Sequence, residues 1–156
     1  MAGTPEFYLT GGTTNTNPNL SLGGGTSTET LSATALNALF DNVTPDEAVA
    51  GDIEYRVLAL KNVGDAALTS LEVFVSQETP SPATSIDIGY DTTTQTLADE
   101  STAPTNVVFG HYTDGNRLSL PDISAGGEVR IYFRRTVQAG ATNYPNDTCK
   151  IKVVYA

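Results

Sequence analysis

Hydrophobic and polar side chains alternate along several short stretches of the chain, which is the pattern of β-strands that bury one face. The most regular stretch is residues 51–62, in which Ile53, Tyr55 and Val57 share one face. The other face mixes charged residues with leucines, so it is only partly polar. The pattern predicts a core strand over residues 51–62.

Alternation continues further along the chain and predicts four more strands, at residues 68–77, 85–91, 125–137 and 148–155. Between the first two strands, Asn62, Gly64 and Asp65 accept turn dihedrals, so we expect a hairpin there. Pro80 and Pro82 each lack an amide donor, which excludes a central strand and predicts a crossing loop.

Short strands separated by turn signals, without the strand–helix–strand alternation of α/β proteins, predict an all-β fold. The leading architecture is an immunoglobulin-like β-sandwich, and a jelly roll is the alternative. We expect the sandwich to span residues 46–156 as one domain. The chain has no Trp and a single Cys, so nothing in it indicates an antibody-type domain.

The opening stretch of the chain has a different composition. Residues 9–28 are rich in glycine, threonine and asparagine and contain few apolar side chains. Ordering each residue costs about 1–2 kcal/mol, and such residues bury little apolar surface. We therefore expect residues 1–45 to form an extended, flexible N-terminal arm outside the sandwich. The arm is expected to hold one short helix near residues 32–41, where apolar residues, among them Leu39 and Phe40, share a face.

The charge of the chain is unevenly distributed. With 18 acidic and 8 basic residues, its formal net charge is -10, which repels phosphate backbones and disfavours nucleic-acid binding. No Lys or Arg precedes Arg56, whereas the last third contains Arg130, Arg134, Lys150 and Lys152. These basic residues are interpreted first as the solvated faces of two strands, and the alternative is that the two ends meet different partners or neighbouring copies of the chain. No apolar run approaches the roughly 18–20 residues that span a bilayer, so we expect no membrane partner.

Residues that carry enzyme chemistry are sparse. His111 is the only histidine, Cys149 is the only cysteine, and no nucleophile-elbow motif is present. Residues Asp87 to Asp91 lack the spaced ligands of a calcium-binding EF-hand loop, although calcium between loops is a minor alternative. We expect no catalytic residue, metal or cofactor. Adjacent carboxylates are interpreted as solvated loop acids, namely Asp46 with Glu47, Asp52 with Glu54, and Asp99 with Glu100.

Three parts of the chain form a recognisable set of motifs. They are LTGGTTNTNPNLSLGG at residues 9–24, GDIEYRVLALKN with TPSPATSIDIG at residues 51–62 and 79–89, and IYFRRTVQAGATNYPND at residues 131–147. In this order they resemble a family of small virion structural proteins from tailed bacteriophages. Val57 stands where the family pattern has a Cys, and the TCKIKVVYA ending replaces a more polar one.

The resemblance implies a non-enzymatic virion protein that assembles in the cytoplasm of the bacterial host. The favoured interpretation is a capsid decoration (cement) protein on the outside of a phage head. It implies the major capsid protein as partner, and a homo-oligomer or copies on a lattice. A tail, neck or fibre-base protein is the alternative. From a different class, a carbohydrate-binding module would stack sugars on tyrosines, here Tyr8, Tyr90, Tyr112 and Tyr144.

Contacts with these partners are expected from two groups of residues. The arm would lie along a neighbouring surface and pair its backbone with exposed strand edges. Its expected contact residues are Phe7, Tyr8, Leu9, Asn15, Asn17, Pro18, Leu20 and Leu22. The second group is expected to form a basic face that meets the acidic arm of an adjacent copy, and comprises Arg130, Arg134, Lys150 and Lys152.

Overall fold

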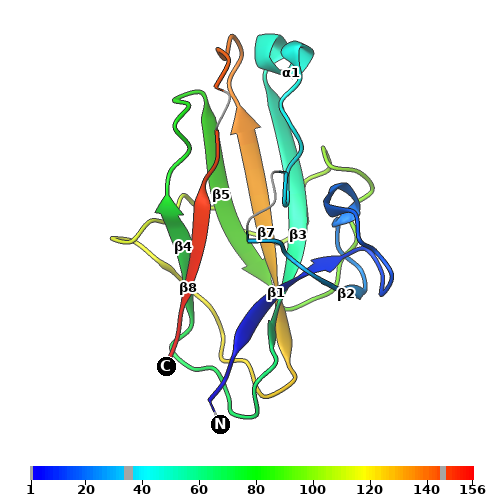
Figure 1. The fold of residues 1–156 in the computed structure, drawn as a ribbon, viewed down its shortest axis with the longest axis vertical. Helices are drawn as coiled ribbons and strands as arrows, with labels where there is room; N and C mark the ends of the chain where they lie inside the picture. Colours follow the sequence, from blue (N-terminus) through cyan, green and yellow to red (C-terminus); the bar gives the residue numbers. More distant parts are fainter. Residues whose placement is uncertain (1, 34–36, 145–146) are drawn as a thin grey trace.

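Two antiparallel sheets make up most of the fold in a computed structural model, which describes residues 2–33, 37–144 and 147–156. The larger sheet contains β1 (Pro5–Thr10), β2 (Thr26–Thr30), β3 (Asp52–Asn62), β5 (Thr84–Asp91) and β7 (Glu128–Val137). The smaller sheet contains β4 (Glu72–Gln77), β6 (Leu118–Ser119) and β8 (Lys150–Val154). The strand order is β2-β1-β3-β7-β5 in the larger sheet and β6-β4-β8 in the smaller one. Figure 1 shows the strands of the larger sheet with β4 and β8 beside them. The expectation of an all-β fold is confirmed.

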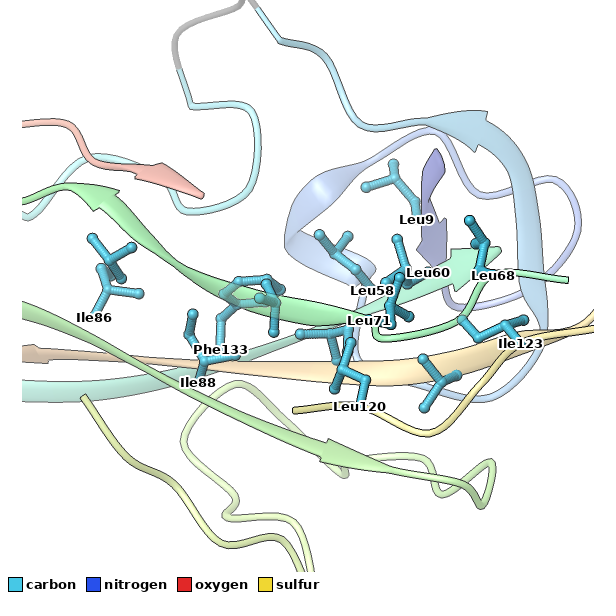
Figure 2. Packing of buried hydrophobic residues seen from close by; sticks show 14 residues of the cluster. Leu9, Leu58, Leu60, Leu68, Leu71, Ile86, Ile88, Leu120, Ile123 and Phe133 are labelled. Atoms are coloured by element: carbon cyan, nitrogen blue, oxygen red, sulfur yellow. The ribbon is translucent and has the colours of Figure 1, made fainter. Parts of the chain in front are cut away.

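The two sheets share one hydrophobic core. Leu58 and Phe133 enter it from the larger sheet, and Val73 and Val75 enter it from the smaller one. Each of these side chains is at most 3% exposed. Figure 2 shows labelled leucines and isoleucines from the larger sheet and from the connecting segments gathered in this core. Burying such a side chain stabilises the fold by about 1.5–3 kcal/mol, so this core is the main source of stability.

β3 is buried on both of its faces. Leu58 and Leu60 lie in the main core, whereas Tyr55 and Val57 enter a second cluster on the outer side of the larger sheet. Tyr132 of β7 and residues from the long connection after β5 complete that second cluster. The strand predicted over residues 51–62 is therefore confirmed, and its partly apolar second face is the one that meets the other sheet.

The expected hairpin between residues 51–62 and 68–77 is wrong. β3 pairs with β1 along one edge and with β7 along the other, so it offers β4 no edge. The chain instead crosses from the larger to the smaller sheet after β3. The proline-bearing loop that contains Pro80 and Pro82 crosses back before β5, as expected.

The prediction that residues 1–45 form an arm outside the sandwich is also wrong. β1 pairs with β3 in continuous register from Pro5 opposite Asn62 to Leu9 opposite Leu58. Leu9 is only 2% exposed and belongs to the main core. β2 then extends the same sheet as the strand beyond β1. The glycine-rich opening is thus an integral part of the larger sheet.

Polar side chains order the stretch between β1 and β2. Thr10 and Ser21 are fully buried, and their hydroxyls both donate to Val57 O, at 2.7 and 2.6 Å. Thr10 Oγ1 also accepts from the Gly23 N–H at 2.9 Å, and Ser21 Oγ accepts from the Thr10 N–H at 2.9 Å. Each hydrogen bond contributes about 0.5–1.5 kcal/mol net, and together they replace the apolar burial that this stretch lacks. This is why the arm prediction fails.

In the described part of the chain the α-helix is α1 (Pro45–Ala50), and it lies after the segment where a helix was expected. Thr44 and Glu47 form a reciprocal capping box, and Pro45 occupies the first turn. Gly51 ends the helix with a φ of 79°. The Thr-x-x-Glu pattern with proline after the threonine is the sequence signal for this helix.

The described residues of the expected helix near 32–41 are not helical, and residues 34–36 lie outside the described ones. We name residues 37–41 the strap. Asn37 lies in a turn and has a φ of 56°, in the left-handed region, and residues 38–40 form bends. Leu39 and Phe40 pack against the main core. Arginine side chains of the sheet bind carbonyl groups of the strap, which competes with helical hydrogen bonding.

Replacing the Thr10 hydroxyl with a methyl group tests whether polar bonds order the opening stretch. We expect Thr10→Val to lower the free energy of unfolding by about 1–3 kcal/mol, because the Gly23 N–H loses its acceptor in a buried site. The measurement is the midpoint of chemical denaturation. Thr14→Val, at an exposed position, is the matched control and should leave the midpoint unchanged. Equal midpoints for Thr10→Val and the wild type would contradict the role of the network.

Candidate functional site

Charged residues interrupt the core face of the larger sheet at one end. Glu54 and Arg56 of β3 lie in phase with Leu58, and Arg135 of β7 lies in phase with Phe133. The three charged residues, which we name the charged cluster, are each at most 6% exposed. The sequence contains a signal for this cluster, because Glu54 and Arg56 lie on the same face of the strand as Leu58 and Leu60. Sequence analysis interpreted that acid as a solvated loop residue, which is wrong.

Ion pairs compensate the buried charges. Arg135 lies opposite Glu54 in the register and forms a close ion pair with it. Arg135 Nη2 also lies 3.5 Å from Asp41 Oδ1. Arg56 pairs with Glu100 at 2.9 Å and with Asp41 at 3.7 Å. The side chains of Asp41 and Glu100 are 44% and 43% exposed. The cluster therefore runs from the buried sheet face to the solvent.

The two arginines also hold the strap in place. The ring centroid of Phe40 lies 5.2 Å from the guanidinium carbon of Arg56 and 5.0 Å from that of Arg135. Arg56 Nε donates to Leu39 O at 3.2 Å, and Arg135 Nη1 donates to Asp41 O at 2.5 Å. A desolvated cation–π contact is worth about 2 kcal/mol. The cluster thus fastens the strap to the core face of the sheet.

The carboxyl group of Glu54 has an unusual acidity. Burial raises its pKa from 4.5 to about 7, although the nearby Arg135 and Arg56 lower it in part. Such values are common at functional sites. Here the carboxyl group faces arginines, and the two surface cavities of about 290 and 410 Å³ are lined by other residues. The arrangement suits a structural role for the carboxyl group.

Carboxylates gather around the charged cluster in two overlapping groups whose ligand atoms lie within 4.8 Å of one another. The groups are Asp41, Glu54 and Glu100, and Glu47, Asp52 and Glu54. A calcium or magnesium ion needs several carboxylate oxygens that are free of other cations. Arg56 and Arg135 already pair with every member of the first group. The residues of that group do not fit a metal ion.

Both ring nitrogens of His111 have partners, and Cys149 is half-buried. His111 Nε2 lies 2.8 Å from Glu78 Oε1, and its Nδ1 lies 3.0 Å from Ile86 O. Burial opposes protonation, but these hydrogen bonds and the charges of Glu78 and Asp87 raise the pKa of His111 overall. Burial raises the pKa of the Cys149 thiol to about 11, which keeps the thiol protonated at neutral pH. The His111 imidazole therefore contacts the backbone of β5 through Ile86 O.

Three of the expected contact residues of the arm face the protein's own interior. Phe7 and Leu9 pack against the main core, and Leu22 packs against the second cluster. Leu9 is buried, whereas Phe7 and Leu22 are only partly buried, so packing within the chain uses part of their apolar surface. The sequence alone did not predict this packing, because it depends on the pairing of β1 with β3.

The other expected contact residues of the arm form a turn and a strand surface. The Asn15 amide group bonds to main-chain atoms on both sides of it. Asn17 caps the short 3-10 helix η1 (Pro18–Leu20), where Pro18 occupies the first position. Leu20 is 58% exposed, and Tyr8 lies beneath the Lys61 ammonium group. Structural hydrogen bonds thus account for the two asparagines.

The four basic residues do not form one face, so that prediction is wrong. Arg130 and Arg134 lie on the outer side of the larger sheet, because the residues that alternate with them pack in the main core. Lys150 and Lys152 lie on the outer side of the smaller sheet for the same reason. The two pairs therefore point away from opposite sides of the sandwich.

The tyrosines considered for sugar stacking are not gathered into one platform. Tyr112 packs against the main core. Tyr8 of β1 and Tyr90 of β5 lie on strands that are separated by β3 and β7. Tyr144 is 40% exposed in the connection after β7. A flat sugar ring could not stack on Tyr8 and Tyr90 together.

The acids considered for calcium have separate partners. Arg134 pairs with Asp87, and Thr93 and Gln95 donate hydrogen bonds to Asp91. Burial acts to raise the pKa of Asp91, but those hydrogen bonds hold it below its ordinary value. The carboxylate oxygens of this stretch are thus already engaged.

Comparisons with known proteins give no relative for this chain. No protein-family model matches it, and neither the curated proteins nor the solved structures contain a match. Among the described residues, no helix has both the length and the apolar character to cross a membrane.

The pKa of Glu54 predicts a specific dependence of stability on pH. A folded-state pKa above the unfolded value means that stability is lost as pH rises from about 4.5 to about 7. Glu54→Gln mimics the protonated form at every pH. We expect the free energy of unfolding of the variant, minus that of the wild type, to rise by up to about 3 kcal/mol across this range. Urea denaturation at several pH values measures the difference. A flat or falling difference would show that the arginines keep the carboxyl group ionised.

Proposed function

We propose that the protein is a non-enzymatic structural component of a tailed-phage virion, in the role of a capsid decoration protein that stabilises the head from outside. The proposal includes an immunoglobulin-like sandwich, with the major capsid protein as partner. Two antiparallel sheets around one core, with connections that cross between the sheets, support the immunoglobulin-like class. The motifs that resemble the virion family support the role.

The arrangement of those motifs in space is the strongest support. Residues 9–24 include the end of β1, and residues 51–62 contain β3. Residues 79–89 include most of β5, and residues 131–147 include most of β7. These strands are consecutive in the larger sheet, in the order β1-β3-β7-β5. Motifs that lie far apart in the sequence therefore form one contiguous structural unit, as a shared fold requires.

Contacts between the motifs add to this support. Thr10 and Ser21 of the first motif bond to the carbonyl group of Val57 in the second. Tyr132 of the last motif packs in the same cluster as Val57. Val57 replaces the Cys of the family pattern at a position with no solvent exposure, where a free Cys also behaves as a small apolar group. The departure from the pattern therefore leaves the packing intact.

A decoration role does not need a free arm. Since the opening stretch belongs to the sandwich, docking would use surface groups of a folded body. Weak contacts repeated over many copies on a lattice give high avidity without one tight site.

The abundance of the chain in purified virions tests the proposal. Quantitative mass spectrometry of intact particles and of separated heads and tails should find this chain with the heads. Its copy number should approach that of the major capsid protein, because a decoration protein covers the lattice. A few copies in the tail fraction would instead indicate a tail, neck or fibre-base protein. Absence from washed particles would contradict the virion role, and a glycan array then tests the carbohydrate-binding alternative.

A further inference from the structure

The outer edge of β5 in the larger sheet is closed. Ile88 exchanges backbone hydrogen bonds with Gly110, at 2.9 and 3.0 Å. Ile86 O lies 3.0 Å from His111 Nδ1. An edge whose N–H and C=O groups are engaged in this way offers little to a further strand.

β8 differs from β5, because β4 occupies only one of its edges. The Val75 N–H of β4 donates to Tyr112 O, on the side of β6. The backbone N–H and C=O groups of the adjacent Phe74 therefore point toward β8, where Lys152 lies opposite Phe74 in the register. Since backbone direction alternates along a strand, the residues on either side of Lys152 point their N–H and C=O groups away from β4.

Ile151 and Val153 of β8, with Tyr155 directly after the strand, form its outer edge, which we name the β8 edge. No hydrogen bond joins the backbone groups of these three residues to any other described residue. Ile151 and Val153 are half-buried against the main core, and Tyr155 is 47% exposed. An open edge with apolar side chains is a template for strand addition.

Two exposed lysines, Lys150 and Lys152, flank the β8 edge. Lys61 contacts the Tyr8 ring. Within the described residues, Lys150 and Lys152 form no ion pair, and both are exposed. All the arginines, by contrast, form ion pairs with acids of the same chain, namely Arg56, Arg117, Arg130, Arg134 and Arg135. Lys150 and Lys152 are therefore exposed positive charges without an ion-pair partner among the described residues, although Asp114 lies near enough to Lys152 for this lysine to lower the pKa of Asp114.

The charge of β8 excludes a second copy of β8 as its partner. Pairing two β8 edges around a twofold axis would bring Lys150 and Lys152 near the same residues of the other copy. Like charges on neighbouring strands destabilise a sheet, and edge lysines are a common device against self-pairing. The same lysines attract an acidic strand.

We propose that the β8 edge binds an extended segment with acidic side chains from a neighbouring protein, by β-strand addition. The backbone groups of Ile151, Val153 and Tyr155 supply the hydrogen bonds, and Lys150 and Lys152 select the charge. The inference rests on the proposed function only for the source of the segment, which is an adjacent protein of the assembly.

Peptide binding to the full chain tests the proposal. The probe is a short synthetic peptide of alternating valine and glutamate, and a peptide with lysine in place of glutamate is its control. NMR of the isotope-labelled protein should show slower hydrogen exchange at the Ile151 and Val153 amides only with the acidic peptide. Salt should weaken this binding, because Lys150 and Lys152 attract the probe by charge.

Proline at the exposed end of the edge provides a matched variant. Tyr155→Pro removes one outward N–H, whereas Tyr155→Thr keeps it, and both remove the ring. We expect about tenfold weaker peptide binding by the proline variant than by the threonine variant, since one hydrogen bond is lost. Equal binding by the two variants, equal binding of the two peptides, or unchanged exchange at β8 would overturn the proposal. Because these assays use the isolated protein, their failure is distinct from absence of the chain from virions.

Discussion

The burial of β3 on all sides is the constraint on which the rest of the structure depends. Its faces fill both hydrophobic clusters, and β7 covers one edge along almost its whole length. β1 covers only part of the other edge, from Leu58 to Asn62. Beyond that point the Val57 N–H donates to Ser21 O and the Tyr55 N–H donates to Glu100 O. A buried strand must satisfy every backbone group, so loops are required where strands end.

This requirement explains the composition of the opening stretch. Threonine, serine and asparagine side chains place hydroxyl and amide groups close to the main chain, where they bond to backbone atoms. Gly23 has a φ of 103°, and a Cβ added there would lie 2.1 Å from Gln95 O. Only glycine fits so close an approach. The polar composition that suggested flexibility thus serves to close an edge of the sheet.

Sequence reasoning was reliable where one physical rule decides the outcome and failed where several segments compete. Alternation located β3, β5 and β7, because side-chain direction in a strand is fixed locally. Strand pairing depends on which edges are already occupied, so the β3–β4 hairpin was predicted wrongly. The helix was missed although Thr44 and Glu47 carry its signal, since the apolar pattern of the strap appeared stronger. The charged cluster was missed because burial of Arg135 depends on Glu54, a residue far away in the sequence.

The order of strands in the two sheets has a kinetic consequence. β4 can pair only with β6 and β8, and β3 needs both β1 and β7, so each pairing joins segments separated by long stretches of chain. Closing such loops costs entropy before any contact forms, and sheets with this topology fold in milliseconds to seconds rather than microseconds. Until β7 arrives, the apolar strand β3 stays exposed and prone to aggregate. Slow folding of the chain is therefore a consequence of its connectivity.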